Sequence, residues 1–191
     1  MKKLMALVLT LVLALSLTAC NDSGTNTNTN TGTNNDKKEE FIVGEIIQKN
    51  VGETIVDEEL GRTITVLEVV KNVPADYLGS DKYFGVALKL RVERNSEMTL
   101  IGGLDFQLLV NGEKAKYAYI TSSFSKYAEE QGWEELESNI PNGESREGWI
   151  IFRVTDSNAE LTFRYARPEL PVTVFGGENY TIPAENFDIK L

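Results

Sequence analysis

The stretch YFGVALKLRVE, residues 83–93, restricts the fold more than any other part of this chain, because its large apolar residues occupy every second position. The positions between them hold glycine, alanine or charged residues. A period of two sends alternate side chains to opposite faces of a strand. The segment therefore predicts a strand with one face in a core, as is common in antiparallel sheets. The core-facing residues would be Phe84, Val86, Leu88, Leu90 and Val92.

A hairpin is predicted where Asn111-Gly112 separates two strand-like runs, because this dipeptide suits a two-residue turn. The register that such a turn sets would pair Val110 with Glu113, Leu108 with Ala115, and Phe106 with Tyr117.

Further strands are predicted on both sides of this hairpin. Residues 52–56 and 62–70 flank an acidic loop, and the apolar phase shifts between Val66 and Leu67, which indicates a β-bulge. Residues 148–154 and 160–166 are joined by a turn-like TDSN, and residues 170–182 resemble a hairpin around Gly176-Gly177.

One segment, residues 122–138, lacks strand alternation and is rich in glutamate. It predicts a short helix or an irregular excursion that Gly132 interrupts. No long amphipathic helices separate the strands, so a βαβ fold is disfavoured. We expect an all-β sandwich of seven to nine strands over residues 41–191.

The N-terminus has the three parts of a secretory signal: Lys2 and Lys3, an apolar run of about 14 residues, and the sequence Leu17-Thr18-Ala19-Cys20. That tetrapeptide resembles a bacterial lipobox, which implies cleavage after residue 19 and lipidation of Cys20. Two acyl chains anchor a protein stably where one does not. An uncleaved anchor helix and an ordinary secretory signal with a stray cysteine are the alternatives.

Residues 20–40 would form a tether, because the tract from Asn21 to Asp36 is rich in Asn and Thr and has no side chain that could build a core. A flexible coil of this length spans roughly 25 Å. Removal of Lys2 and Lys3 with the signal changes the formal net charge from −10 to −12. Attachment to the outer face of the cell membrane would therefore depend on the lipid.

Composition excludes several classes of function. The chain has no histidine and one cysteine, so histidine-based nucleophile systems, histidine metal sites and internal disulfides are ruled out. Its acidic charge and lack of a basic stripe argue against nucleic-acid binding. No motif indicates a cofactor.

The order of these segments resembles a family of secreted Gram-positive lipoprotein domains with an immunoglobulin-like (telokin-like) sandwich and no assigned function. The resemblance covers residues 44–165 and rests on two stretches: Phe106 to Gly112, and the Pro-x-Gly-Glu turn and following strand, Pro141 to Val154. It implies a fold and a surface location, and it assigns no catalytic residues.

Three groups of carboxylates could carry chemistry: Asp57, Glu58 and Glu59; Asp76 and Asp81; and Glu129, Glu130, Glu134, Glu135 and Glu137. No loop has the alternating ligands of a calcium site, and the sequence cannot place two carboxylates across a cleft. A solvated acidic face is the favoured interpretation. Calcium binding and catalysis by paired carboxylates are the alternatives.

Aromatic residues in the excursion suggest a partner-binding surface. Trp133 lies among glutamates and could anchor a partner or cap the sandwich, with Phe124 and Tyr127 beside it. Trp149 begins a strand and should belong to the core or its edge. The chain is thus predicted to be a lipid-anchored, non-enzymatic module that binds an extracellular protein, an envelope polymer or a small ligand.

Overall fold

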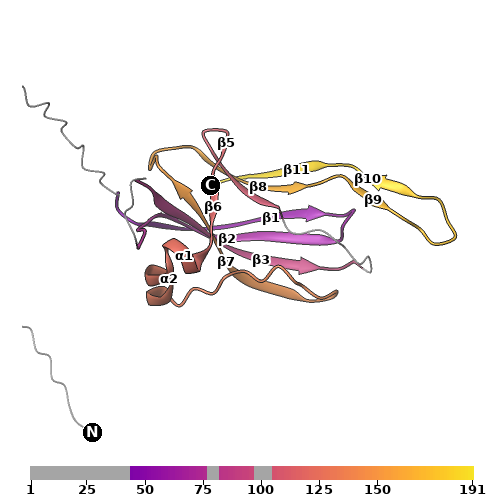
Figure 1. The fold of residues 1–191 in the computed structure, drawn as a ribbon, viewed down its shortest axis with the longest axis horizontal. Coiled ribbons are helices and arrows are strands. Elements are labelled where there is room, and N and C mark those ends of the chain that lie inside the picture. The colour runs from indigo at the N-terminus through magenta and orange to yellow at the C-terminus, as the bar shows by residue number, and fades with distance from the viewer. Residues whose placement is uncertain (1–43, 77–81, 97–104) are drawn as a thin grey trace, which may run out of the picture. The chain divides into compact units, whose positions relative to one another are not determined.

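The computed structural model describes residues 44–76, 82–96 and 105–191, and every pairing between its named strands is antiparallel. Figure 1 shows the two main sheets. Side chains from both sheets form one hydrophobic core. The five-stranded sheet has the order β1 (Ile47–Asp57), β2 (Arg62–Val73), β3 (Phe84–Arg94), β7 (Ser145–Val154), β6 (Lys116–Ala118). The four-stranded sheet has the order β11 (Glu185–Lys190), β8 (Leu161–Arg167), β4 (Phe106–Val110), β5 (Glu113–Lys114).

A separate two-stranded ribbon contains β9 (Leu170–Val172) and β10 (Tyr180–Ile182), which confirms the predicted hairpin around Gly176 and Gly177. The described part of the chain is thus an all-β sandwich with eleven strands rather than seven to nine. The excess comes from strands of two or three residues, which are too short to show alternation in a sequence.

The core lies between the two main sheets and contains the predicted face of β3. Its members from both sheets include Leu88, Leu90, Leu108, Phe163 and Tyr165, all of which are completely buried. Burying one such apolar side chain contributes about 1.5–3 kcal/mol. The alternation in the sequence is therefore explained by packing between the sheets.

The predicted β-bulge is confirmed in β2. Val66 pairs with Leu90 and Glu68 with Lys89, so Leu67 has no partner position on β3. The acidic loop joins β1 to β2 in a tight hairpin whose first pair is Asp57 with Arg62.

The Asn111-Gly112 turn is confirmed, and both residues have positive φ, 51° and 87°. Val110 pairs with Glu113 as predicted. The predicted pairing of Phe106 with Tyr117 is wrong, because the chain leaves the four-stranded sheet after Lys114. It joins the other sheet as β6, where Tyr117 pairs with Phe152.

The excursion contains two short helices, α1 (Ile120–Ser123) and α2 (Ser125–Gln131). Gly132 ends α2 with φ of 65°, and its N–H bonds to the carbonyls of Ala128 and Glu129. Asp76 caps the start of α2 from another loop, since its Oδ2 accepts from Ser125 Oγ at 2.7 Å and from the Lys126 N–H at 2.9 Å.

These helices cover part of the outer face of the five-stranded sheet, so that face is not all solvent-exposed. A second core forms there from Val70, Val73, Ala87, Ala118, Ile120, Phe124, Ala128, Trp149 and Ile151. A β-carbon on Gly85 would lie 2.8 Å from Ile151 Cδ1 and 3.0 Å from Phe124 Cε1. Glycine at this strand position is explained by the close approach of the Phe124 ring.

Candidate functional site

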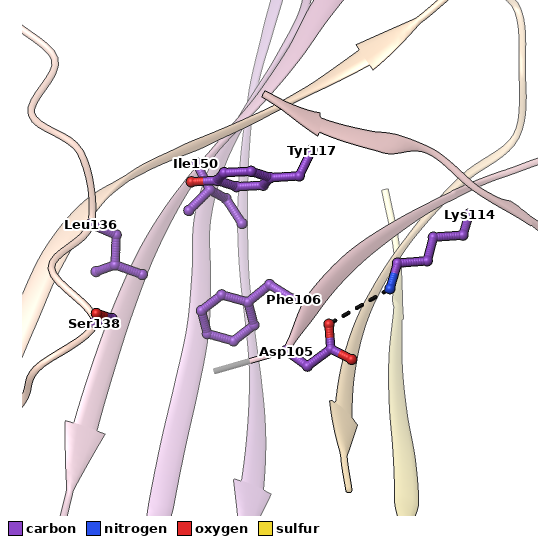
Figure 2. Close-up of a pocket in the computed structure, with 7 residues that line it drawn as sticks. All are labelled: Asp105, Phe106, Lys114, Tyr117, Leu136, Ser138 and Ile150. Carbon is purple, nitrogen blue, oxygen red and sulfur yellow. Dashed lines mark ion pairs between the residues drawn. The ribbon is translucent and has the colours of Figure 1, made fainter. Parts of the chain in front are cut away.

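A pocket of about 280 Å³ opens at the seam between the two main sheets. Figure 2 shows Leu136 and Ser138 on one side of it and Asp105 and Lys114 on the other, with Phe106 and Tyr117 between. Ile150 completes the lining. The two sheets and the segment that follows α2 thus each contribute to the pocket.

The crossing of the chain between the sheets creates this pocket. Phe106 begins β4 and packs against Phe163 and Tyr165, at centroid distances of 5.5 and 6.1 Å. Tyr117 lies in β6, where its ring contacts that of Phe152 at 5.6 Å. The two rings therefore belong to different sheets, and the space between them is open instead of being closed by strand pairing.

The outer wall of the pocket follows α2 and is fixed to β7 by backbone hydrogen bonds. Trp149 donates to the Glu134 carbonyl at 2.8 Å, and Leu136 donates to the Trp149 carbonyl at 3.0 Å. A β-carbon on Gly148 would overlap the backbone of Leu136. Gly148 therefore permits the close approach that positions Leu136.

Two polar interactions border the apolar walls. Lys114 Nζ lies 3.7 Å from Asp105 Oδ1 in an exposed ion pair, and the Tyr117 hydroxyl donates to Glu135 Oε1 at 2.9 Å. Burial and this hydrogen bond raise the pKa of Tyr117 well above its usual value. The hydroxyl is therefore a neutral donor at physiological pH, and the pocket has mostly apolar walls with a polar border.

The predicted partner-binding residues lie elsewhere, over the outer face of the five-stranded sheet. Trp133 stacks on Trp149 with 4.0 Å between ring centroids, and Tyr127 makes a T-shaped contact with Trp133 at a centroid distance of 5.3 Å. Trp149 is buried, as predicted. Phe124 is completely buried, so its side chain is not available to a partner. Partner binding by Trp133 and Tyr127, which are half-buried, stays a prediction.

The interpretation of the first acidic loop as a solvated face is wrong for Asp57. Its carboxylate is buried and accepts hydrogen bonds from Arg167 Nη1, Tyr165 Oη and the Leu60 N–H. Glu58 and Glu59 are exposed. Sequence could not reveal the difference, because the partners Tyr165 and Arg167 are more than a hundred positions away.

The remaining carboxylates do not converge in the described residues. Asp76 caps α2, and Asp81 lies outside the described residues. Within residues 44–76, 82–96 and 105–191, no three His, Cys, Asp or Glu side chains are placed to share a metal ion. No helix in those ranges is long and apolar enough to cross a membrane. Cys20 also lies outside them.

The sequence did not reveal the pocket, because no motif marks it. Its residues come from four separate segments, and the predicted pairing of Phe106 with Tyr117 would have filled it. Two features of the sequence relate to the pocket. One is the Asn111-Gly112 turn, and the other is Gly148, a glycine at the start of an apolar strand for which the sequence offers no reason.

Comparison with known proteins adds little. No protein-family model and no curated sequence matches the chain. The fold is similar to that in the crystal structure of a conserved hypothetical protein from Bacillus anthracis, with a TM-score of 0.47 and 12% identity over 62% of this chain and 89% of that one. A similarity of this size carries no functional conclusion.

Proposed function

We propose that this protein is a lipid-anchored extracytoplasmic lipoprotein whose sandwich serves as a non-enzymatic binding module. The signal-like residues 1–19 and the lipobox-like sequence ending at Cys20 support the anchor. Two antiparallel sheets around a shared core support an immunoglobulin-like (telokin-like) arrangement. Attachment to the outer face of the membrane would present the sandwich to proteins or polymers of the envelope.

The pocket at the sheet seam carries the proposal for binding. Ligand sites are concave and mostly apolar, with a few polar groups that orient the ligand. Here Phe106, Tyr117, Leu136 and Ile150 supply apolar surface, and the polar groups lie at the border. About 280 Å³ is small for a whole ligand. The pocket therefore suits one aromatic or aliphatic group of a larger partner.

An aromatic probe tests this binding site. The probe is N-acetylphenylalaninamide, titrated into the mature chain, residues 20–191, with Cys20→Ser to prevent lipidation. We expect amide chemical-shift changes around Phe106, Tyr117 and Ile150. Ser138→Trp should abolish them, because a large side chain at the exposed border would fill the opening. Ser145→Trp, at an exposed position of β7 outside the pocket, is the matched control.

Absence of shifts at these residues, or the same shifts in Ser138→Trp, would remove the pocket from consideration as a binding site.

The anchor is tested separately, in a Gram-positive host grown with labelled palmitate. The wild-type chain should take up the label and stay with the membrane. Cys20→Ala should lose the label and should not be processed by the lipoprotein pathway. Equal labelling of the two proteins would contradict lipidation at Cys20.

A further inference from the structure

A second cavity adjoins the pocket at the sheet seam. It is an open depression of about 620 Å³, lined by Tyr119, Glu135, Leu136, Glu137, Ser138 and Asn139. Leu136 and Ser138 also line the apolar pocket, where Figure 2 shows them. The two cavities therefore adjoin along the segment that follows α2, and together they are called the double pocket below.

Two tyrosines also connect the cavities. Tyr117 lines the apolar pocket and Tyr119 lines the depression, and their rings make a T-shaped contact with a centroid distance of 5.3 Å. The chain between them is extended, since β6 ends at Ala118 and Tyr119 has φ of −72° and ψ of 141°. Side chains two residues apart in an extended chain lie on one face, about 7 Å from each other. The spacing of the two cavities therefore suits side chains at alternate positions of an extended ligand.

The depression carries an excess of negative charge. Glu135 accepts a hydrogen bond from the Tyr117 hydroxyl at 2.9 Å, and this neutral donor leaves the carboxylate charge uncompensated. The Glu137 side chain is 73% exposed, and Arg146 Nε lies 3.6 Å from its Oε2. Nη2 of the same guanidinium is closer to Glu144 Oε2, at 2.6 Å. Two carboxylates therefore share this guanidinium, and the charge of Glu135 adds to theirs.

These charges indicate a cationic group as the occupant of the depression. The faces of tyrosine rings also attract cations, and Tyr119 is 63% exposed beside Glu135 and Glu137. At the other border of the apolar pocket, Lys114 is paired with Asp105, so that border adds no net charge. The double pocket therefore fits a partner with a basic side chain close to the apolar one, and it would repel an acidic partner.

We propose that the double pocket binds an extended segment of a partner protein with the pattern apolar-x-basic, in either chain direction. A phenylalanine or leucine side chain enters the pocket between Phe106 and Tyr117. A lysine or arginine two positions away enters the depression beside Glu135 and Glu137. The proposal rests on the pocket being a binding site, as argued above, and it adds the chemistry of the partner.

Peptide titrations test this pattern, with the mature Cys20→Ser chain and amide chemical shifts as the measurement. The probes are the acetylated and amidated tripeptides Phe-Ala-Lys and Lys-Ala-Phe, each with a counterpart in which glutamate replaces lysine. The better of the two lysine peptides should bind at least about threefold more tightly than its glutamate counterpart. Sodium chloride at about 0.5 M should reduce this preference, because salt screens exposed charges. Moving lysine next to phenylalanine in the better peptide should weaken binding, because adjacent side chains point to opposite faces.

Two double substitutions locate the cation. Glu135→Gln with Glu137→Gln removes two charges and keeps the size of the side chains, so the lysine and glutamate peptides should then bind equally. Glu129→Gln with Glu130→Gln is the matched control, because it removes the same charge from exposed positions of α2 outside both cavities. The control should keep the preference for lysine.

A preference for lysine that survives in the Glu135→Gln, Glu137→Gln protein, or that the control loses equally, would overturn the proposal. Shifts that N-acetylglucosamine causes at Tyr119 and Glu135, without shifts from the lysine peptides, would overturn it in favour of a saccharide site. If N-acetylphenylalaninamide enters the pocket but lysine gives no advantage, the basic partner is wrong and the binding site stands. If neither that probe nor any peptide shifts Phe106 and Tyr117, both proposals fail.

Discussion

Arg167 Nη1 lies 2.5 Å from Asp57 Oδ1, although the two residues are 110 positions apart and both side chains are buried. The contact joins the end of β1 to the end of β8, and therefore one main sheet to the other. Tyr165 Oη donates to the second carboxylate oxygen at 3.1 Å and accepts from Arg62 Nη1 at 2.9 Å. A buried charge surrounded in this way is costly to leave without its partners.

Replacing Asp57 should therefore destabilise the sandwich strongly. Asp57→Ala leaves the buried Arg167 without its main counterion, and we expect a loss of about 3–5 kcal/mol in the free energy of unfolding. Urea denaturation followed by tryptophan fluorescence measures this. Glu58→Ala, at the exposed neighbouring position, is the control and should change stability by less than about 0.5 kcal/mol. Equal effects of the two substitutions would contradict the role of the buried pair.

Gly148→Ala should displace the outer wall of the pocket. The new methyl group would overlap the backbone of Leu136, and overpacking of this kind costs about 1–3 kcal/mol. Binding of the aromatic probe should weaken as well, because Leu136 lines the pocket. Ser145→Ala, at an exposed position of the same strand, should affect neither measurement. Unchanged stability and probe binding in Gly148→Ala would show that this wall is not held as described.

Trp133→Ala should lower stability, because the indole covers Trp149 on the outer sheet face. We expect about 1–3 kcal/mol from the loss of stacking and apolar burial, measured by urea unfolding. Trp133→Phe keeps an aromatic ring and should recover part of the loss. A Trp133→Ala protein as stable as the wild type would contradict this covering role and favour the alternative that Trp133 anchors a partner.

Acid should weaken the attachment of α2 through Asp76. Burial raises the pKa of its carboxyl, but hydrogen bonds from the Lys126 N–H and from Ser125 outweigh this and leave the pKa below its ordinary value of 3.8. A lowered folded-state pKa contributes stability above about pH 4, and this contribution is lost as the pH falls through the folded value. Melting temperatures measured between pH 7 and pH 2 should therefore fall less steeply in Asp76→Asn than in the wild type. Parallel pH profiles would contradict this.

Local patterns in the sequence were sufficient to predict several elements. The alternation in residues 83–93 predicted the core face of β3. The phase shift at Val66 and Leu67 predicted the β-bulge in the adjacent strand β2. The Asn111-Gly112 turn was also correct. Each of these depends on residues a few positions apart, where side-chain period and turn chemistry act directly.

The candidate site could not be predicted in this way. The alternating pattern of residues 113–119 fits a single long strand as well as it fits two short strands in different sheets. The two short strands are favoured because Tyr117 then packs on Phe152, a contact that depends on β7 more than thirty residues later. The pocket is a consequence of that choice.

The sequence by itself determined that the chain forms strands with one apolar face, where several of them turn, and that only one cysteine precedes them. Those properties follow from composition and short-range periodicity. Only the tertiary structure decided that Asp57 is buried with Arg167, that Phe124 lies under the helices rather than on the surface, and that Phe106 and Tyr117 line one pocket. These outcomes depend on packing between distant segments, and burial is a property of the whole arrangement rather than of any residue type.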